Sequence, residues 1–309
     1  MSSLKLIFMG SPEFALPSLR RLHTSRHQVQ AVVSGPDKKR GRGGKKTPTP
    51  VKALALDLGL PVIEADSMKA PELARTLSDY GADVFVVVAF KILPPALLRI
   101  PRFGAVNLHA SLLPEFRGAA PIHHAVMQGK SKTGCTVFRL NAGIDTGGII
   151  TQTSTQIGPD ETTGEVYQRL MHQGADALLD ALDAMAEGRA SYAPQDDTKA
   201  TKAPKLFDEH CRLSFDLPAR NVHNHIRGLS PFPTAFAYLD GKKIKLLRSR
   251  VLDEESHAKP PGTLELLGET AVLYCNPGRL ELGDVKYEGR KQMSAAAFLR
   301  GHQGGMRLE

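Results

Sequence analysis

The chain has 309 residues, of which 41% are hydrophobic and 23% charged. This is long enough for two domains with buried cores, and the composition is that of a globular protein rather than a disordered or fibrous one. No apolar run approaches the roughly 20 residues that a membrane-spanning helix requires. The apolar stretch at the amino terminus is too short for a secretory signal and predicts a first strand. Three widely separated cysteines, without metal-ligand spacing, predict free thiols and a cytoplasmic protein.

The net charge of +8 is concentrated in one short segment. Between Pro36 and Lys52 there are seven Lys or Arg residues and one acidic residue, Asp37, so this segment carries +6 of the total. Such a concentration is the footprint of a protein that binds a phosphate backbone. The alternative is a solvated loop that only improves solubility. Gly and Pro break regular structure in residues 35–50, and the lysines repel one another, which predicts a flexible excursion.

The first third of the chain predicts strands alternating with helices. Residues 4–9 form an apolar run typical of a buried strand, and Ser11 and Pro12 fit the cap and the first position of a helix. The next predicted elements are a helix over 16–22, strands over 29–33 and 60–63, helices over 51–58 and 71–77, and a central strand over 83–89. This order predicts a doubly wound α/β domain. The first turn lacks the pattern G-x-G-x-x-G, so a dinucleotide site is not indicated.

The segment 107–117, NLHASLLPEFR, carries the strongest chemical signal. Alternation along a short strand places Asn107 and His109 on one face. Pro114 ends regular structure, so residues 111–114 should form a rigid loop at the strand's carboxyl end, where ligands bind in open α/β sheets. An Asn amide can stabilise an oxyanion and a His can transfer a proton near neutral pH, which suits acyl transfer. Taken alone, these two residues also fit a structural His and a turn Asn.

The rest of the chain predicts the end of this domain and a second, smaller one. The first domain, residues 1–189, ends with a helix over 121–128, a strand over 134–140, a turn-rich loop containing Asp145, an edge strand over 149–157 and a helix over 162–186. His123 and His124 are interpreted as part of a partly exposed helix face. Polar residues 190–205 predict a linker. Residues 206–309 predict a small barrel, with a helix over 221–227 and strands over 235–239, 242–247, 263–267, 271–275 and 280–285.

Several motifs together resemble those of the folate-dependent formyltransferases. They are G-S-P-E-F at 10–14, N-L-H at 107–109, S-L-L-P-E-F-R-G-A-A-P at 111–121 and G-I-D-T-G at 143–147. The resemblance covers almost the whole chain and implies an enzyme with a Rossmann-like, doubly wound formyltransferase domain followed by an OB-like β-barrel. It implies that Asn107, His109 and Asp145 are catalytic, with 10-formyltetrahydrofolate as co-substrate and no metal. The folate site that it implies consists of Ser111, Leu112, Leu113 and Pro114.

The loop 90–94, F-K-I-L-P, departs from the family pattern. It is one residue shorter than usual and carries Lys91 where Gly is common. Because this loop lines the folate pocket in the family, the resemblance implies altered contacts there.

The basic segment and the G-S-P-E-F turn resemble those of methionyl-tRNA formyltransferases in particular. The pattern G-R-G-G-K-K at 41–46 matches, with one extra Gly, an insertion that contacts the tRNA acceptor arm. The tRNA contacts that the resemblance implies are Arg42, Lys45, Lys46 and Lys205. From residue 206 to the end there are 15 basic and 13 acidic residues, so binding by this domain requires a local patch. Candidates for that patch are Lys242, Lys243 and Lys245, with a solvated hairpin as the alternative.

The resemblance implies an enzyme, without a membrane partner, that formylates methionyl initiator tRNA. A monomer is expected, because an asymmetric tRNA substrate gives no reason for a dimer. A sugar-nucleotide N-formyltransferase is the main alternative, because it shares the core motifs, although it does not need the basic segment. Glycinamide ribonucleotide formyltransferase and formyltetrahydrofolate hydrolase share Asn, His and Asp, but the first is usually shorter and the second has an additional amino-terminal domain. A non-catalytic RNA-binding protein would explain the basic segment but not the arrangement of Asn107, His109 and Asp145.

Overall fold

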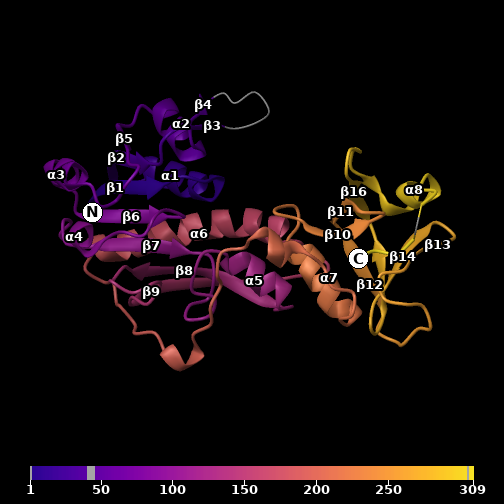
Figure 1. The fold of residues 1–309 in the computed structure, drawn as a ribbon. Coiled ribbons are helices and arrows are strands. Elements are labelled where there is room, and N and C mark those ends of the chain that lie inside the picture. Colours follow the sequence, from indigo (N-terminus) through magenta and orange to yellow (C-terminus); the bar gives the residue numbers. More distant parts are fainter. Residues whose placement is uncertain (1, 40–45, 305) are drawn as a thin grey trace. The chain divides into compact units, whose positions relative to one another are not determined.

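The computed structural model describes residues 2–39, 46–304 and 306–309. The chain forms two compact units (Figure 1). Unit 1 comprises Met1–Gly118, Gly134–Thr155 and Tyr167–Lys202, and unit 2 comprises Ala119–Thr133, Gln156–Val166 and Ala203–Glu309. Each unit is described by itself below.

Unit 1 is built on a seven-stranded sheet with the order β5-β2-β1-β6-β7-β8-β9. The strands are β1 (Lys5–Gly10), β2 (Gln28–Ser34), β5 (Val62–Glu64), β6 (Val84–Val88), β7 (Ala105–His109), β8 (Lys132–Arg139) and β9 (Ile149–Gln156). The first five of the order are parallel, and β8 is antiparallel to β7. The chain extends from β1 first to one side and then to the other, which confirms the predicted doubly wound fold. Strand β6, whose five residues are all buried, lies in the middle, as its apolar run predicted.

Helices cover the sheet and leave the carboxyl end of β7 for a site. The helical elements of unit 1 are η1 (Glu13–Ala15), α1 (Leu16–His23), α2 (Pro50–Asp57), α3 (Pro71–Asp79), α4 (Pro95–Leu98), most of α6 (Thr163–Ala186) and η2 (Asp197–Lys199). On one face, residues such as Phe85 and Val87 pack against α3 and α4 in a single apolar cluster. On the other face, Gly174 of α6 packs against Leu108 of β7, since a Cβ there would lie 2.9 Å from the Leu108 side chain. Asn107 and His109 alternate with Leu108, so they lie on the face that α3 and α4 cover.

One prediction about the amino-terminal part of unit 1 was wrong. Ser11 does not cap a helix, because η1 precedes α1 and Ala15 occupies the N-cap position of α1. The Ser11 hydroxyl accepts a hydrogen bond from the Gly35 amide at 3.3 Å instead.

The flexible excursion predicted over 35–50 falls largely on residues 40–45, which lie outside the described residues; at the described ends of the segment, β3 (Lys38–Lys39) pairs antiparallel with β4 (Lys46–Thr47). The physical reason lies in the residues that flank it. Thr49 caps α2 by accepting from the Lys52 amide, and Lys52 Nζ lies 2.7 Å from Asp37 and 2.5 Å from Glu64. These contacts hold the two ends of the segment together. They also neutralise Lys52, which therefore adds little to the basic potential of the segment.

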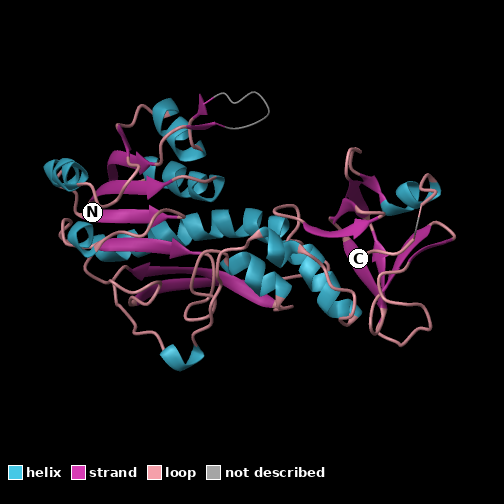
Figure 2. Ribbon diagram, viewed as in Figure 1, coloured by secondary structure: helices cyan, strands magenta, loops and turns pink. Residues whose placement is uncertain are grey.

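Unit 2 is rich in strands (Figure 2). It contains two four-stranded antiparallel sheets with the orders β10-β11-β16-β17 and β12-β15-β14-β13. The strands are β10 (Ala235–Leu239), β11 (Lys242–Leu246), β12 (Ser249–Asp253), β13 (Leu264–Leu267), β14 (Thr270–Tyr274), β15 (Arg279–Leu282), β16 (Asp284–Tyr287) and β17 (Met293–Ser294). Both sheets contribute to one apolar core, which includes Ile244, Leu273 and Phe298. The arrangement is consistent with the predicted OB-like β-domain.

The helices of unit 2 are α5 (Pro121–Met127), η3 (Asp208–Cys211), α7 (Ala219–Gly228) and α8 (Ala295–Arg300). The predicted strand over 280–285 was wrong, because it is two strands that belong to different sheets. The change of sheet occurs at Gly283, whose amide donates to the Arg248 carbonyl at 2.9 Å. Strand β12 and helix α8 were not predicted. They are short elements, and they depend on the sheets and the core for their stability.

The start of α6 matches its sequence signal, T-T-G-E. Thr162 and Glu165 form a reciprocal cap: the Glu165 carboxylate accepts from the Thr162 amide at 2.8 Å and from the Thr162 hydroxyl at 2.7 Å. Partial burial acts to raise the pKa of Glu165. The hydrogen bonds from Thr162 and the Arg248 guanidinium outweigh that effect and lower the pKa to about 2. Glu165 is therefore ionised at neutral pH, as the positive end of the helix dipole favours.

Candidate active site

The site is built around the carboxyl end of β7. His109 is the last residue of the strand and is 6% exposed, and Asn107 is half-buried two residues before it. Within the sheet, Val87 of β6 pairs with Asn107, and Thr136 of β8 pairs with His109. The structure thus places the Asn amide and the imidazole on one face at the end of a parallel strand, as the sequence predicted.

The His109 ring has a defined orientation. Its Nε2 lies 2.9 Å from the carbonyl oxygen of Phe116, and because a carbonyl can only accept, Nε2 carries the proton of this hydrogen bond. The other ring nitrogen, Nδ1, lies 3.8 Å from Asp145 Oδ2. That separation permits an electrostatic interaction but is longer than a direct hydrogen bond. Nδ1 is therefore the nitrogen that is available for proton transfer.

Asp145 lies in the loop between β8 and β9. Its φ of +54° is in the left-handed region, which Asp tolerates better than most residues. The Asn141 side chain shapes the loop by accepting from the Gly143 amide at 3.0 Å and the Thr146 hydroxyl at 2.8 Å. Asp145 Oδ2 accepts from the Gly118 amide at 2.9 Å, and the side chain is 15% exposed. These contacts aim the carboxylate toward His109.

Two residues that the sequence reasoning missed hold the loop 111–114. The Thr136 hydroxyl donates to the Ser111 carbonyl at 2.7 Å and accepts from the Leu113 amide at 3.1 Å. Gln152 Nε2 donates to the Leu113 carbonyl and to the Thr136 hydroxyl, each at 2.9 Å. In the sequence, the only indication of this role is a Thr within an otherwise apolar strand and a Gln on the next strand.

The four residues of the predicted folate site differ in accessibility. Ser111 and Leu113 are buried, and the Ser111 hydroxyl donates to the Glu115 carbonyl at 2.6 Å. Leu112 and Pro114 are half-buried. Because the Ser111 carbonyl and the Leu113 amide and carbonyl are bonded within the protein, the side chains of Leu112 and Pro114 are the parts of this loop that a ligand could contact.

The nearby loop 89–94 is held by Lys91, whose Nζ donates to the Ala65 carbonyl at 3.0 Å and to the Asp66 carbonyl. The substitution of Gly by Lys therefore adds an anchor between two loops of unit 1. Ile92, the next residue, is 76% exposed. The anchor fixes this shortened loop, while Ile92 remains accessible.

Of the predicted tRNA contacts, Arg42 and Lys45 lie outside the described residues. Lys46 is exposed in β4. Lys205 is exposed in unit 2, with its Nζ 5.4 Å from the centre of the Phe207 ring. Phe207 is 54% exposed, so Lys205 and Phe207 offer a cation and an aromatic surface side by side.

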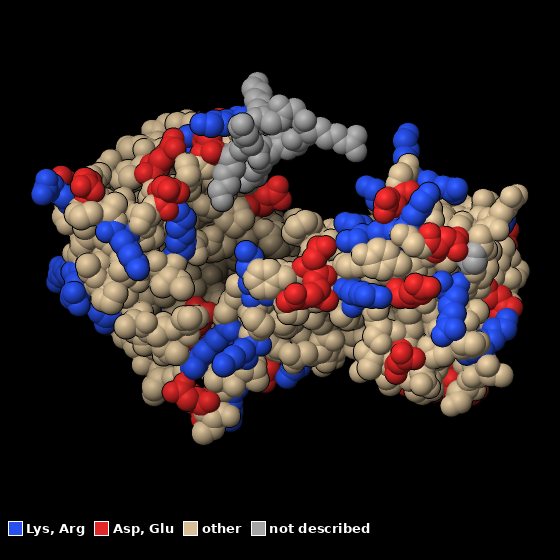
Figure 3. All heavy atoms as spheres, in the orientation of Figure 1, with Lys and Arg blue, Asp and Glu red and all other residues tan. Residues whose placement is uncertain are grey.

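Unit 2 carries a basic face on the sheet β10-β11-β16, formed by Arg212, Phe236, Tyr238, Lys243, Lys245 and Lys286. The strand register pairs Lys245 with both Phe236 and Lys286 and pairs Lys243 with Tyr238. Lys243 Nζ lies 3.8 Å from the centre of the Phe236 ring. Lys and Arg side chains gather over this part of the unit (Figure 3). Lys242, which pairs with the buried Leu239, projects from the opposite side of β11, so the three candidate lysines do not form one patch.

The other candidate groups have structural contacts. His123 lies near the Phe232 carbonyl at 3.1 Å, and burial lowers its pKa. His124 lies 3.0 Å from the Pro204 carbonyl. The three cysteines are free and buried, and burial raises the pKa values of Cys135 and Cys275 to about 12, so their thiols are unreactive. Among the described residues, no group of His, Cys, Asp and Glu is placed to hold a metal, and no helix is long and apolar enough to span a membrane.

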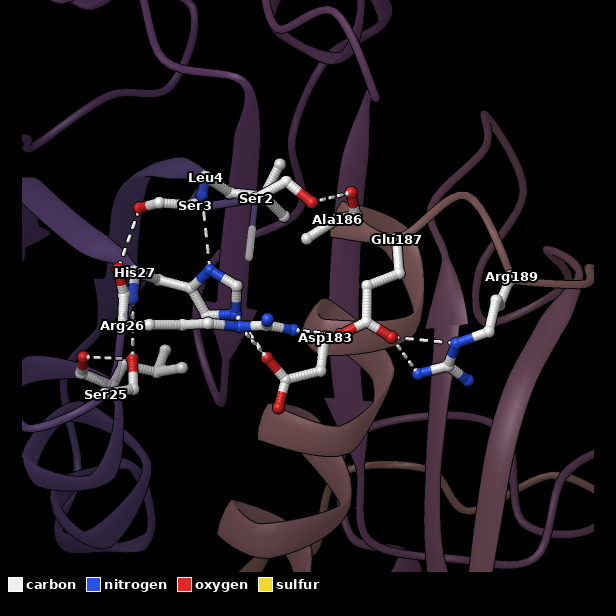
Figure 4. A network of polar contacts seen from close by, with 11 residues as sticks. Ser2, Ser3, Leu4, Ser25, Arg26, His27, Asp183, Ala186, Glu187 and Arg189 are labelled. Carbon is white, nitrogen blue, oxygen red and sulfur yellow. Dashed lines mark hydrogen bonds and ion pairs between the residues drawn. The ribbon is translucent and has the colours of Figure 1, made fainter.

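A second cluster of titratable side chains lies at the amino ends of β1 and β2 (Figure 4). Arg26 Nε lies 2.6 Å from Asp183 Oδ1, and its Nη2 lies 2.7 Å from Glu187. The buried His27 accepts from the Leu4 amide through Nδ1, and burial lowers its pKa. These contacts fasten the carboxyl end of α6 to the sheet. They lie at the opposite end of the parallel strands from His109.

Comparisons with known proteins agree with this architecture. A family model described as formyl transferase matches residues 4–182, and one described as formyl transferase, C-terminal domain, matches residues 205–303. A methionyl-tRNA formyltransferase of Chlorobium luteolum is 45% identical over 303 residues, with 96% of each chain covered. One from a Methylobacterium species is 42% identical over 306 residues, with 97% of each chain covered.

Among solved structures, the sugar 3N-formyl transferase WlaRD, determined with dTDP and 5-N-formyl-THF, has a TM-score of 0.69 at 16% identity. The match covers 93% of this chain and 99% of that one, and it shows a common fold. The chain therefore belongs to the formyl transferase family and, within it, to the methionyl-tRNA formyltransferases. The resemblance inferred from the motifs is confirmed.

Proposed function

We propose that this protein transfers the formyl group of 10-formyltetrahydrofolate to the α-amine of methionine on initiator tRNA. The observation that carries the proposal is the arrangement of Asn107, His109 and Asp145 at the carboxyl end of β7, with His109 Nδ1 3.8 Å from Asp145 Oδ2. Relatives that match nearly the full length of this chain are named for this activity. The folate derivative bound by WlaRD supports a folate co-substrate.

The chemistry follows from the roles of the three side chains. The amine nitrogen attacks the formyl carbon, and the carbonyl oxygen becomes an oxyanion that the Asn107 amide stabilises by hydrogen bonding. Removing one such donor from an enzyme typically costs about 3–4 kcal/mol of transition-state stabilisation. His109 Nδ1 accepts the proton from the amine and returns it to the departing folate nitrogen as the old carbon–nitrogen bond breaks. The Asp145 carboxylate stabilises the imidazolium that exists between these steps.

The folate would bind against the loop 111–114. Thr136 and Gln152 bind the backbone of Ser111 and Leu113, so the shape of this loop is preorganised. Leu112 and Pro114 would provide apolar contacts to the ring. The anchored loop 89–94 would form a second wall, on which the exposed Ile92 is available.

The direct test is formyl transfer from 10-formyltetrahydrofolate to charged initiator tRNA, charged elongator tRNA and free methionine, compared in parallel. We expect the initiator tRNA to be formylated with a kcat/KM at least about 100-fold above either alternative, which corresponds to roughly 3 kcal/mol of discrimination. Binding of folate without transfer to any of the three acceptors would contradict the proposal. That outcome would favour an amino-sugar nucleotide as acceptor.

We further propose that tRNA is bound by Arg42, Lys45, Lys46 and Lys205 together with the basic face of unit 2. Lys245 and the exposed Lys286 suit a surface that follows a phosphate backbone, and the exposed Phe207 offers a ring on which a base can stack. Phe236 is only 6% exposed and Lys243 pairs with Asp208 at 3.3 Å, so these two residues contribute less. The family models that match residues 4–182 and 205–303 support a catalytic domain followed by a tRNA-binding domain, proposed at 1–189 and 206–309. The residues proposed as a linker, 190–205, belong to unit 1 as far as Lys202, and unit 2 also takes in Ala119–Thr133 and Gln156–Val166. An asymmetric tRNA gives no reason for a dimer, so the protein is proposed to act as a cytoplasmic monomer. A dimer mass in sedimentation at assay concentrations would contradict the proposed state.

The double substitution Lys245→Ala and Lys286→Ala tests the basic face. We expect the KM for charged tRNA to rise about tenfold and the salt dependence of binding to weaken by roughly two counterions, because each lysine neutralises one phosphate. Folate affinity should not change. Lys5→Ala, at the amino end of β1, is the matched control. An unchanged KM in the double variant would mean that this face does not bind tRNA. Arg42→Ala tests the basic segment in the same assay.

A further inference from the structure

The segment 190–202, predicted from its composition as part of a linker, lies against the loops of the candidate active site. Ala193 and Ile149 form an isolated antiparallel bridge, with hydrogen bonds of 2.8 and 2.9 Å. Further along, the Thr201 hydroxyl accepts from the Phe116 amide at 2.8 Å, and the Thr201 carbonyl accepts from the Arg117 amide at 2.9 Å. The segment is therefore fixed at two points, and Gln195 lies between them.

All the polar atoms of the Gln195 side chain are used to join two loops. Its Nε2 donates to the carbonyl oxygens of Asp145 at 2.9 Å and Gly147 at 2.8 Å. Its Oε1 accepts from Arg117 Nε at 3.1 Å and from Arg117 Nη2 at 2.7 Å. An amide is the side chain that can donate two bonds on one side and accept two on the other.

The two loops are those that orient the catalytic groups. One contains Phe116, whose carbonyl holds His109 Nε2, and Gly118, whose amide holds the Asp145 carboxylate. The other contains Asp145 itself, in a left-handed conformation that must be maintained by its surroundings. Gln195 fixes the peptide carbonyl of Asp145 and, through Arg117, the loop that positions the His109 ring. Arg117 is also held by Asp197 at 2.7 Å.

We propose that Gln195 is a positioning residue that keeps the Asp145 carboxylate and the His109 ring in their mutual orientation. The inference rests on the proposed formyl transfer, because its effect on rate requires that reaction. A small displacement of a catalytic group lowers the rate without weakening substrate binding. The contribution of Gln195 is therefore expected in kcat.

Gln195→Glu is the sharpest test, because the carboxylate keeps the shape and the Arg117 contacts but cannot donate to the two carbonyls. We expect kcat to fall about 10- to 100-fold, with both KM values within about twofold of the wild type. Gln195→Met, which adds no charge, should likewise lower kcat and leave both KM values unchanged. This variant provides the test if the Glu variant does not fold. The matched control is Gln168→Glu, an exposed position on α6 that undergoes the same charge change. Wild-type kcat in both Gln195 variants would overturn the proposal, and so would a loss confined to KM.

A second readout does not depend on turnover. The ¹⁵N resonances of the His109 ring report which nitrogen is protonated and what it contacts, and they can be assigned by comparison with His109→Gln. We expect them to shift in Gln195→Met and to stay unchanged in Gln168→Glu, at similar melting temperatures. Unshifted His109 resonances in a folded Gln195 variant would overturn the positioning role. Failure of the wild type to transfer formyl would instead overturn the proposed function, and the resonance comparison would still test the orientation of His109.

Discussion

His109→Ala is expected to lower kcat for formyl transfer by about three to four orders of magnitude. The imidazole is the group at the site that can take a proton from the attacking amine near neutral pH, and loss of a general base typically costs 10²–10⁴-fold. Removing it also removes a hydrogen-bond donor to the oxyanion when the ring is protonated, which adds to the effect. The KM values should change little. Nε2 is occupied by the Phe116 carbonyl, so the ring can meet the substrates only through Nδ1, at the reacting atoms.

Single-turnover kinetics with saturating charged tRNA measures this effect on the chemical step. Because His109 is buried, His109→Gln should accompany the Ala variant, since its amide retains a donor for the Phe116 carbonyl. His172→Ala, at an exposed position on α6, is the control and should retain wild-type kinetics. Asn107→Ala should lose about 10²–10³-fold in kcat, as expected for one oxyanion donor. Near-normal turnover of a folded His109→Ala protein would remove the basis of the proposed chemistry.

Gly147→Ala is expected to abolish most activity and to destabilise unit 1. A Cβ at this position would lie 1.6 Å from the Arg139 carbonyl oxygen and 2.9 Å from its carbonyl carbon, so the backbone cannot keep its course. Any displacement of Gly147 also moves Asp145, which lies two residues before it in the same loop. It also moves the Gly147 carbonyl, which accepts a hydrogen bond from Gln195. We expect a loss of about 2–4 kcal/mol in the free energy of unfolding and at least a 100-fold loss in kcat.

Urea unfolding followed by circular dichroism gives the first quantity, and the formylation assay gives the second. Gly158→Ala is the matched control, because the nearest heavy atom to a Cβ there is 3.5 Å away. That change should alter the free energy of unfolding by less than about 1 kcal/mol. A Gly147→Ala protein with the stability and kcat of the control would show that the loop can move without consequence for Asp145.

Much of the fold and the centre of the site followed from the sequence, because the relevant signals are local. The apolar run of β6 predicted a central strand, since both faces of such a strand are buried. The spacing N-x-H placed Asn107 and His109 on one face, because side chains alternate along a strand. Periodicity and capping residues predicted α6, whose Thr162 and Glu165 form the expected cap. Motifs in these segments also identified the family, which the full-length relatives confirm.

The tertiary structure decided how distant segments complete the site. Gln195 and Arg117 are 78 positions apart, and although Arg117 lies in the motif at 111–121, no local signal indicates that the two side chains meet. The polar composition of residues 190–202 is the same whether they extend into solvent or bind the loops of unit 1. Lys52 counts as a positive charge in the sequence, yet in the fold Asp37 and Glu64 neutralise it. The sequence thus determined which side chains are proposed to carry the chemistry, through short-range periodicity, steric preference and motifs. Which residues hold them in place depends on contacts that exist only after the chain has folded, when loops remote in sequence meet at the carboxyl end of β7.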